Sequence, residues 1–185
     1  MRDILIRHAH IADCPALARI IITATESAFR GRVPDKCLTW LTPEESAANW
    51  AKNFKTEDTL DPGDYLYVAT NDTSGVVGFA MLTPVTAEDE YDPHIADAYF
   101  HELRSIHIDP AWQRQGIGRR LLAKVADTVQ RDGGNRLLVK VLVENPNVAF
   151  YERLGAVLLG SRPYDWEGFR TTELIYGWRD VTSLS

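Results

Sequence analysis

The chain has 185 residues, a length that fits one domain able to bury a full core. Its hydrophobic fraction of 45% and charged fraction of 25% are those of an ordinary globular protein and exclude a disordered or fibrous one. The net charge of −6 argues against a nucleic-acid partner, because nucleic-acid binding needs a concentrated basic surface.

Cysteines and apolar runs bear on where the protein works. Cys14 and Cys37 are too few for a disulfide framework and are not spaced as metal ligands. The sequence shows neither a cleavable apolar leader nor a run of about 18 apolar residues. We therefore expect a cytoplasmic protein without membrane contact, and base rates favour a homodimer.

The first 60 residues predict a short strand and two helices. Residues 4–7 suit a strand, and Asp13 is placed to cap a helix whose apolar residues follow at helical spacing. Thr42 and Glu45 form a capping-box pattern around Pro43, which would start the second helix.

From residue 65 onward the pattern alternates between strands and helices. Helical spacing begins at Gly116 and stops at residues 133–134, and a short helix opens at Asn145 and ends at Gly155. The order predicts a single mixed α/β domain over residues 1–185, with a central mixed β-sheet of about seven strands flanked by about four helices. The expected strands are residues 65–69, 76–82, 99–109, 137–143 and the hairpin 157–178.

Two glycines lie where a strand passes into a helix, in the segment Gln-Arg-Gln-Gly-Ile-Gly-Arg of residues 113–119. The free N–H groups of a first helical turn favour an anionic phosphate, and arginines beside them add positive charge. A diphosphate therefore suits this loop, while a glycine turn with surface arginines is the competing interpretation. The dinucleotide fingerprint is excluded by Leu121, and no P-loop sequence is present.

A second motif follows about thirty residues later, where residues 145–155 read Asn-Pro-Asn-Val-Ala-Phe-Tyr-Glu-Arg-Leu-Gly. The pairing of Gln-x-x-Gly-x-Gly with Asn…Phe-Tyr-Glu-x-Leu-Gly resembles the GNAT superfamily of acyl-CoA N-acyltransferases, with the strong match from about residue 102 to 155. The resemblance implies acetyl transfer from acetyl-CoA to a primary amine of a small molecule, by direct attack in a ternary complex and without a metal.

Several acceptors and one other class of function stay open. Polyamines, amino acids and amino-sugar antibiotics are candidate small-molecule acceptors. Acetylation of a protein N-terminus or lysine is a second enzyme hypothesis, and it would need an open groove rather than a closed pocket. A catalytically silent acetyl-CoA-binding sensor is the alternative outside enzymes.

The resemblance also implies which residues hold acetyl-CoA. Backbone N–H groups of the glycine loop would hold the diphosphate, and the strand before the loop would pair with the pantetheine arm. Pro146 makes the segment before the Phe-Tyr pair one residue shorter than the family's more common form. The implied cofactor-binding residues are Ile106, His107, Ile108, Gln113, Arg114, Gln115, Gly116, Ile117, Gly118, Arg119, Asn145, Phe150 and Tyr151.

Two proton transfers need catalytic groups, because the amine must lose a proton and the departing thiolate gains from a donor. The resemblance implies Tyr151 as the acid and Glu102 as the base. Glu102 lies four residues before Ile106, which predicts the same strand face. The competing interpretations are a core aromatic for Tyr151 and an edge carboxylate paired with Arg104 for Glu102.

The acceptor side is less defined in the sequence. Phe29 and Arg30 are implied as substrate-binding residues, and Arg30 would suit an acceptor with a carboxylate. The acidic run of residues 88–92 would instead attract a cationic amine, unless it is solvated surface. Tyr164 and Trp166 suit either an acceptor pocket or a dimer contact.

Overall fold

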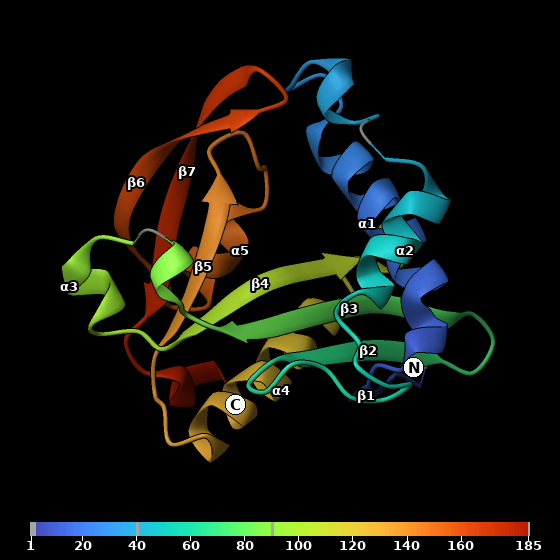
Figure 1. Cartoon of the computed structure of the whole chain (residues 1–185), viewed down its shortest axis with the longest axis horizontal. Coiled ribbons are helices and arrows are strands. Elements are labelled where there is room, and N and C mark those ends of the chain that lie inside the picture. The colour runs from blue at the N-terminus through green and yellow to red at the C-terminus, as the bar shows by residue number, and fades with distance from the viewer. Residues whose placement is uncertain (1–2, 40, 90, 185) are drawn as a thin grey trace.

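The computed structural model describes residues 3–39, 41–89 and 91–184, and confirms the expected mixed sheet of seven strands flanked by helices (Figure 1). The strand order across the sheet is β1-β2-β3-β4-β5-β7-β6. The strands are β1 Leu5–His8, β2 Tyr65–Asn71, β3 Gly75–Pro84, β4 His101–Ile108, β5 Leu137–Leu142, β6 Val157–Trp166 and β7 Phe169–Trp178. The helices are α1 Cys14–Phe29, α2 Pro43–Ala51, α3 Pro93–Ala96, α4 Ile117–Arg131 and α5 Val148–Arg153.

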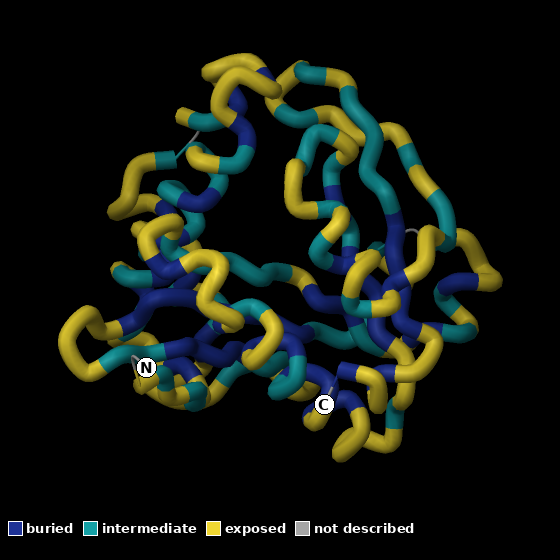
Figure 2. Tube along the Cα trace, turned by 180° about the vertical axis from the view of Figure 1, so that it is seen from behind, coloured by how far each residue is buried: buried dark blue, intermediate teal, exposed yellow. Residues whose placement is uncertain are grey.

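Helices cover both faces of the half of the sheet formed by β2, β3 and β4. On one face Leu17, Ile20 and Trp50 of α1 and α2 pack against alternate residues of β2 and β3. On the other face the apolar side of α4, including Leu121 and Val125, packs against the residues in between. The buried core therefore follows the strands and α4, as the dark trace in Figure 2 shows.

The sequence predicted side-chain caps at the starts of α1 and α2, and the structure confirms only the one at α2. The expected capping box is present, since the Thr42 hydroxyl accepts from the Glu45 N–H at 3.2 Å. Asp13 stands at the N-cap of α1, but it makes no side-chain cap. The expected cap is wrong because the Asp13 carboxylate pairs with Arg7 at 2.7 Å and accepts from the His10 N–H at 2.9 Å.

The two halves of the sheet diverge between β4 and β5 (Figure 1). These parallel strands pair only at Glu102↔Leu138 and Leu103↔Val139, near the start of each strand. Antiparallel β3 alone pairs with β4 from Ser105 to Ile108. The separation leaves a wedge beside the last residues of β4, and α5 and the start of α4 lie at this wedge.

A β-bulge in β4 changes which side chains share a face. Met81 pairs with Ser105 but Leu82 pairs with Leu103, so Arg104 is an extra residue with no partner in β3. One extra residue reverses the alternation of side chains along a strand. Leu103 and Ile106 consequently both face α4, and the expectation that Glu102 shares the face of Ile106 is wrong.

Candidate active site

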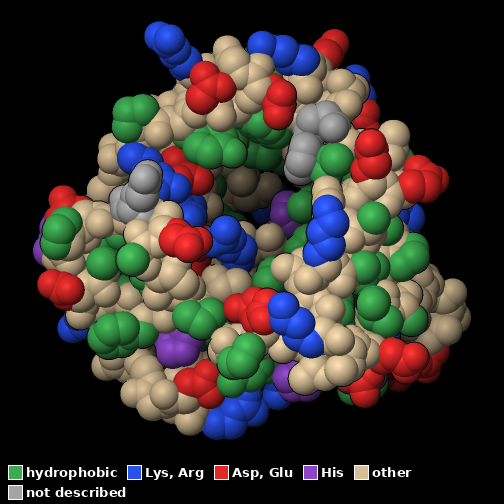
Figure 3. Space-filling view, in the orientation of Figure 1, with side chains coloured by type: hydrophobic (Ala, Val, Ile, Leu, Met, Phe, Trp, Pro, Cys, Tyr) green, Lys and Arg blue, Asp and Glu red, His purple; other side chains and the backbone are tan. Residues whose placement is uncertain are grey.

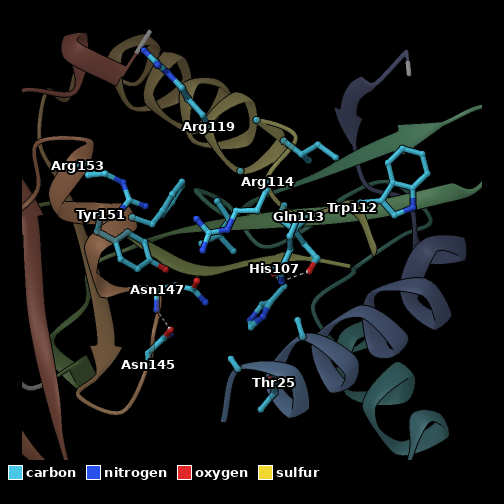
Figure 4. A pocket seen from close by; sticks show the side chains of 18 of the residues that line it. Thr25, His107, Trp112, Gln113, Arg114, Arg119, Asn145, Asn147, Tyr151 and Arg153 are labelled. Atoms are coloured by element: carbon cyan, nitrogen blue, oxygen red, sulfur yellow. Dashed lines mark hydrogen bonds between the residues drawn. The ribbon is translucent and has the colours of Figure 1, made fainter. Parts of the chain in front are cut away.

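The wedge between β4 and α5 holds a cavity of about 360 Å³, here called the first cavity (Figure 4). Most of the residues expected to bind the cofactor line it, although they come from three separate segments of the chain. Those residues are Ile106, His107, Ile108, Gln113, Arg114, Gly116, Ile117, Gly118, Arg119, Asn145, Phe150 and Tyr151. Lining residues that the sequence analysis missed are Ala24, Thr25, Ala28, Trp112, Asn147 and Arg153.

The glycine loop presents backbone donors to this cavity. Gly116 caps α4 with φ +79°, a left-handed conformation that favours glycine. The first helical hydrogen bond runs from the N–H of Arg120 to Gly116, so the N–H groups of the three residues between them precede the helix ladder. A Cβ on Gly118 would lie 3.4 Å from the ring of Phe150, so Gly118 packs directly against the opposite wall of the cavity.

Side chains around the loop add charge and hold it in place. Arg114 has φ +61°, and its guanidinium points toward the middle of the cavity (Figure 4). Gln113 donates from Nε2 to the carbonyl of Ile108 at 3.2 Å, which ties the loop to the end of β4. Free N–H groups, a helix dipole and an arginine are the donors that a diphosphate requires, so the residues present fit the phosphates of acetyl-CoA.

The opposite wall is built by the segment that connects β5 to α5. Asn145 accepts from the N–H of Asn147 at 2.9 Å, which fixes the turn into the helix. Tyr151 is 7% exposed, and its ring makes edge contacts with Phe150 and Trp178 at centroid distances of 5.3 and 6.2 Å. Its hydroxyl points into the cavity (Figure 4), and burial raises the pKa of Tyr151 to about 12. The phenol therefore keeps its proton at neutral pH.

A second cavity of about 550 Å³ lies between α1, α2, β4 and the β6–β7 hairpin. It opens in the hollow at the centre of the face shown in Figure 3. Tyr164 and Trp166 both line it, as expected if these residues border an acceptor pocket. The two cavities share Thr25, Phe29 and His107, so they meet at these three side chains.

His107 occupies the meeting point. Its ring points toward the first cavity (Figure 4) and lies 5.3 Å from the ring of Phe79. Enclosure by protein lowers the pKa of His107 to about 4, since burial disfavours the charged imidazolium. At neutral pH the side chain is thus a neutral imidazole, with one nitrogen free to accept a proton or hydrogen bond.

Residues 26–156 of the chain match the model of the acetyltransferase (GNAT) family. This protein belongs to the GNAT acetyltransferase family.

Relatives of this GNAT protein cover almost its whole length. The Bacillus subtilis protein YuaI, an uncharacterised N-acetyltransferase, is 26% identical over 182 residues, which are 98% of this chain and 96% of YuaI. The PaiA N-acetyltransferase of Thermoplasma acidophilum, solved in complex with coenzyme A, has a TM-score of 0.69 at 18% identity, over 93% of this chain and 98% of that one. Salmonella typhimurium yncA, solved with its cofactor acetyl-CoA, has a TM-score of 0.64 at 20% identity, over 95% of this chain and 93% of that one. Family and relatives together make this protein an acetyl-CoA-dependent N-acetyltransferase.

Among residues 3–39, 41–89 and 91–184, no helix is long and apolar enough to cross a membrane.

Three expected site residues lie away from both cavities of the GNAT domain. Gln115 donates to the carbonyl of Ala111 at 3.4 Å, and Arg30 pairs with Glu26 on the surface. Glu102 is 1% exposed and lies in neither cavity lining.

Glu102 belongs to a buried charge network beside the second cavity. Its carboxylate accepts from the Tyr91 hydroxyl at 2.7 Å and lies 3.2 Å from Lys140 Nζ. Lys140 also lies 3.7 Å from Asp89, which in turn contacts Arg104 at 3.1 Å. The carboxylate of Glu102 thus pairs with Lys140, not with Arg104 as the sequence suggested.

The acidic residues between positions 88 and 92 lie in different environments. Burial alone would raise the pKa of Asp89, but hydrogen bonds from Thr86 and the charges of Lys140 and Arg104 hold it below its usual range. Glu88 and Asp92 are exposed, and the carboxylate of Asp92 accepts from the N–H of residue 94 at the start of α3. Glu90 lies outside the described residues.

Glu102→Gln is expected to lower the free energy of unfolding by about 3 kcal/mol, because it removes the closer of the two carboxylates that pair with Lys140 in this buried network. We expect kcat to fall less than about tenfold, since the carboxylate reaches neither cavity. Urea unfolding and steady-state rates would measure both, with exposed Glu88→Gln as the control. A loss of kcat above about 100-fold at unchanged stability would instead make Glu102 the proton acceptor.

Proposed function

We propose that the enzyme transfers an acetyl group from acetyl-CoA to the primary amine of a small molecule, by direct attack in a ternary complex. The observation that carries this proposal is the meeting of two cavities at Thr25, Phe29 and His107. The first cavity suits a long anionic cofactor, and the second gives an acceptor its own approach to the same point.

In this proposal acetyl-CoA supplies the thioester that the amine attacks. The N–H groups at the start of α4 and the Arg114 guanidinium hold its phosphates. The edge of β4 from Ile106 to Ile108, which β5 does not cover, offers backbone groups to the pantetheine arm. Asn145 and Phe150 line the opposite wall of the arm.

Proton transfer falls to His107 and Tyr151, whose side chains point into the cavity. The neutral imidazole of His107 accepts the proton of the incoming amine, directly or through a water. The Tyr151 hydroxyl donates a proton to the departing sulfur. Glu102 supports the sheet beneath them through Lys140, and its assignment as the base, inferred from the sequence, stays a prediction.

A small acceptor is favoured over a protein because a bridge closes one end of the second cavity. The segment after α1 reaches across to the tip of the β6–β7 hairpin, where the Cys37 thiol lies 3.2 Å from the carbonyl of Trp166. The rings of Phe29 and Trp166 meet edge to face at 5.3 Å, and Val33 completes this apolar contact. A bridge at this end interrupts the extended groove that a polypeptide substrate requires.

The test is release of CoA from acetyl-CoA by the purified protein against polyamines, amino acids, aminoglycosides and short peptides. We expect release with one class of small amine and none with peptides. Release with peptides alone would contradict the proposal in favour of protein acetylation. Tight acetyl-CoA binding without release from any amine would support the sensor hypothesis instead.

Arg114→Gln is expected to weaken acetyl-CoA binding about tenfold, because a charge-assisted bond to phosphate is lost. The loss should shrink at 1 M salt, where charges are screened beyond about 3 Å. Calorimetric titration at two salt concentrations measures both effects. Arg120→Gln is the matched control, since Arg120 donates to the carbonyl of Ile4 and does not line the cavity. Equal affinities for the two variants would remove Arg114 from the phosphate site.

A further inference from the structure

The second cavity has few charged groups, and its one carboxylate is already paired. Among the described residues that line it, the charged side chains are Arg104 and Glu173. Glu173 is 13% exposed and lies 2.7 Å from Nε of Arg162. The guanidinium of Arg162 also donates to the carbonyl of Asp89 at 2.8 Å, which fixes it in that position. This carboxylate is therefore poorly placed to receive a cationic acceptor.

Arg104 is the cationic side chain among the charged residues that line this cavity. It is the extra residue of the bulge in β4, and bulges redirect side chains near functional sites. Its side chain is 51% exposed and forms an ion pair with Asp89 at 3.1 Å. Asp89 also faces Lys140, and its other oxygen accepts from the N–H of Thr86 at 2.7 Å. Lys140 also pairs with Glu102, so the charges of this network balance. Among the described residues Asp89 contacts Arg104 only at Nη1, which leaves the half-exposed guanidinium with further donors for a carboxylate.

The rest of the cavity is mainly apolar. Trp50 and Leu41 come from the α2 side, while Leu142, Tyr164 and Trp166 come from the other half of the sheet. Figure 3 shows hydrophobic side chains on the upper wall of the hollow and basic side chains toward its left border. Polyamines and aminoglycosides carry several ammonium groups, and burying these without unpaired anions is costly.

We infer that the acceptor is an amino acid with a bulky apolar side chain, whose carboxylate binds Arg104 while its amine lies at His107. This inference rests on the proposed function of the same site. A guanidinium presents paired donors that match a carboxylate, which an ammonium or amide does not. Arg104 precedes His107 by three residues, about 10 Å along a strand, and both side chains line the second cavity. In this inference the long arginine side chain spans most of that distance to reach the carboxylate of an amino acid whose amine lies at His107.

Matched pairs of acceptors test the inference. L-tryptophan against tryptamine, L-phenylalanine against phenethylamine and L-leucine against isoamylamine differ only in the carboxylate. With rates corrected for the unprotonated amine, we expect the wild-type kcat/KM to favour each amino acid by at least about tenfold. Arg104→Gln should bring the ratio close to one, because kcat/KM falls far more for the amino acids than for the decarboxylated amines. Arg104→Lys, which keeps the charge but loses the paired donors, should give an intermediate ratio.

Arg170→Gln is the matched control, because Arg170 is exposed on the β6–β7 hairpin and lines neither cavity. It should keep the wild-type ratio. Wild-type preference for decarboxylated amines or spermidine would overturn the inference while leaving small-amine acetylation intact. A ratio unchanged in a folded Arg104→Gln protein would also overturn it. CoA release with peptides alone, or with no amine, would overturn the proposed function as well.

Discussion

Tyr151→Phe is expected to lower kcat about 100-fold while changing the affinity for acetyl-CoA less than about twofold. The hydroxyl points into the first cavity and, with its pKa raised to about 12, stays protonated and able to donate. General-acid groups contribute about 100-fold or more. The ring contacts with Phe150 and Trp178 survive the substitution, so the cavity keeps its shape. Thiol release measures kcat, and calorimetric titration measures the affinity.

Tyr176→Phe is the matched control, since it removes another buried tyrosine hydroxyl that donates to Glu152 at 2.8 Å, away from the cavity lining. Its kcat should stay within about twofold of wild type. An undiminished kcat for Tyr151→Phe would show that Tyr151 only fills the core.

His107→Asn is expected to lower kcat/KM for the amine about 100-fold, again with little change in acetyl-CoA binding. Asparagine keeps a polar side chain at the meeting point of the cavities but cannot take a proton. Retention of the wild-type rate would contradict the role of His107 and return attention to Glu102.

The pH dependence gives a second test of His107. Because burial lowers its pKa to about 4, the imidazole is the competent base at any pH well above 4. Once corrected for the free amine, kcat/KM should stay level from pH 9 down to pH 6 and fall only as the pH approaches 4. A decline near pH 6.5, absent in His107→Asn, would show that the imidazole has its ordinary pKa in the working enzyme.

Local signals in the sequence predicted most of the residues that line the first cavity. Gly116 and Gly118 stand at a strand-to-helix junction, and the Asn145 to Tyr151 segment opens a helix after a buried strand, so short patterns locate both. Asn147 was within reach of the same reasoning, because it lies two residues after Asn145 in the same motif. Sequence spacing alone could not reveal Thr25, which reaches the cavity only through the packing of α1 on the sheet.

The position of Glu102 shows where sequence patterns fail. Alternation predicted one face for Glu102 and Ile106, but the bulge at Arg104 reverses it. A bulge is a property of two paired strands, and neither strand announces it alone. The same bulge brings Arg104 to the second cavity. The sequence analysis had instead suggested Arg30 as the arginine of the acceptor site.

Initial rates over a grid of acetyl-CoA and amine concentrations test direct transfer between the two cavities most directly. Because both cavities open on His107, the proposed mechanism has both substrates bound together, and double-reciprocal plots should then intersect. Parallel lines would show that the acetyl group first moves to the protein and that CoA leaves before the amine arrives, which would contradict transfer in a ternary complex.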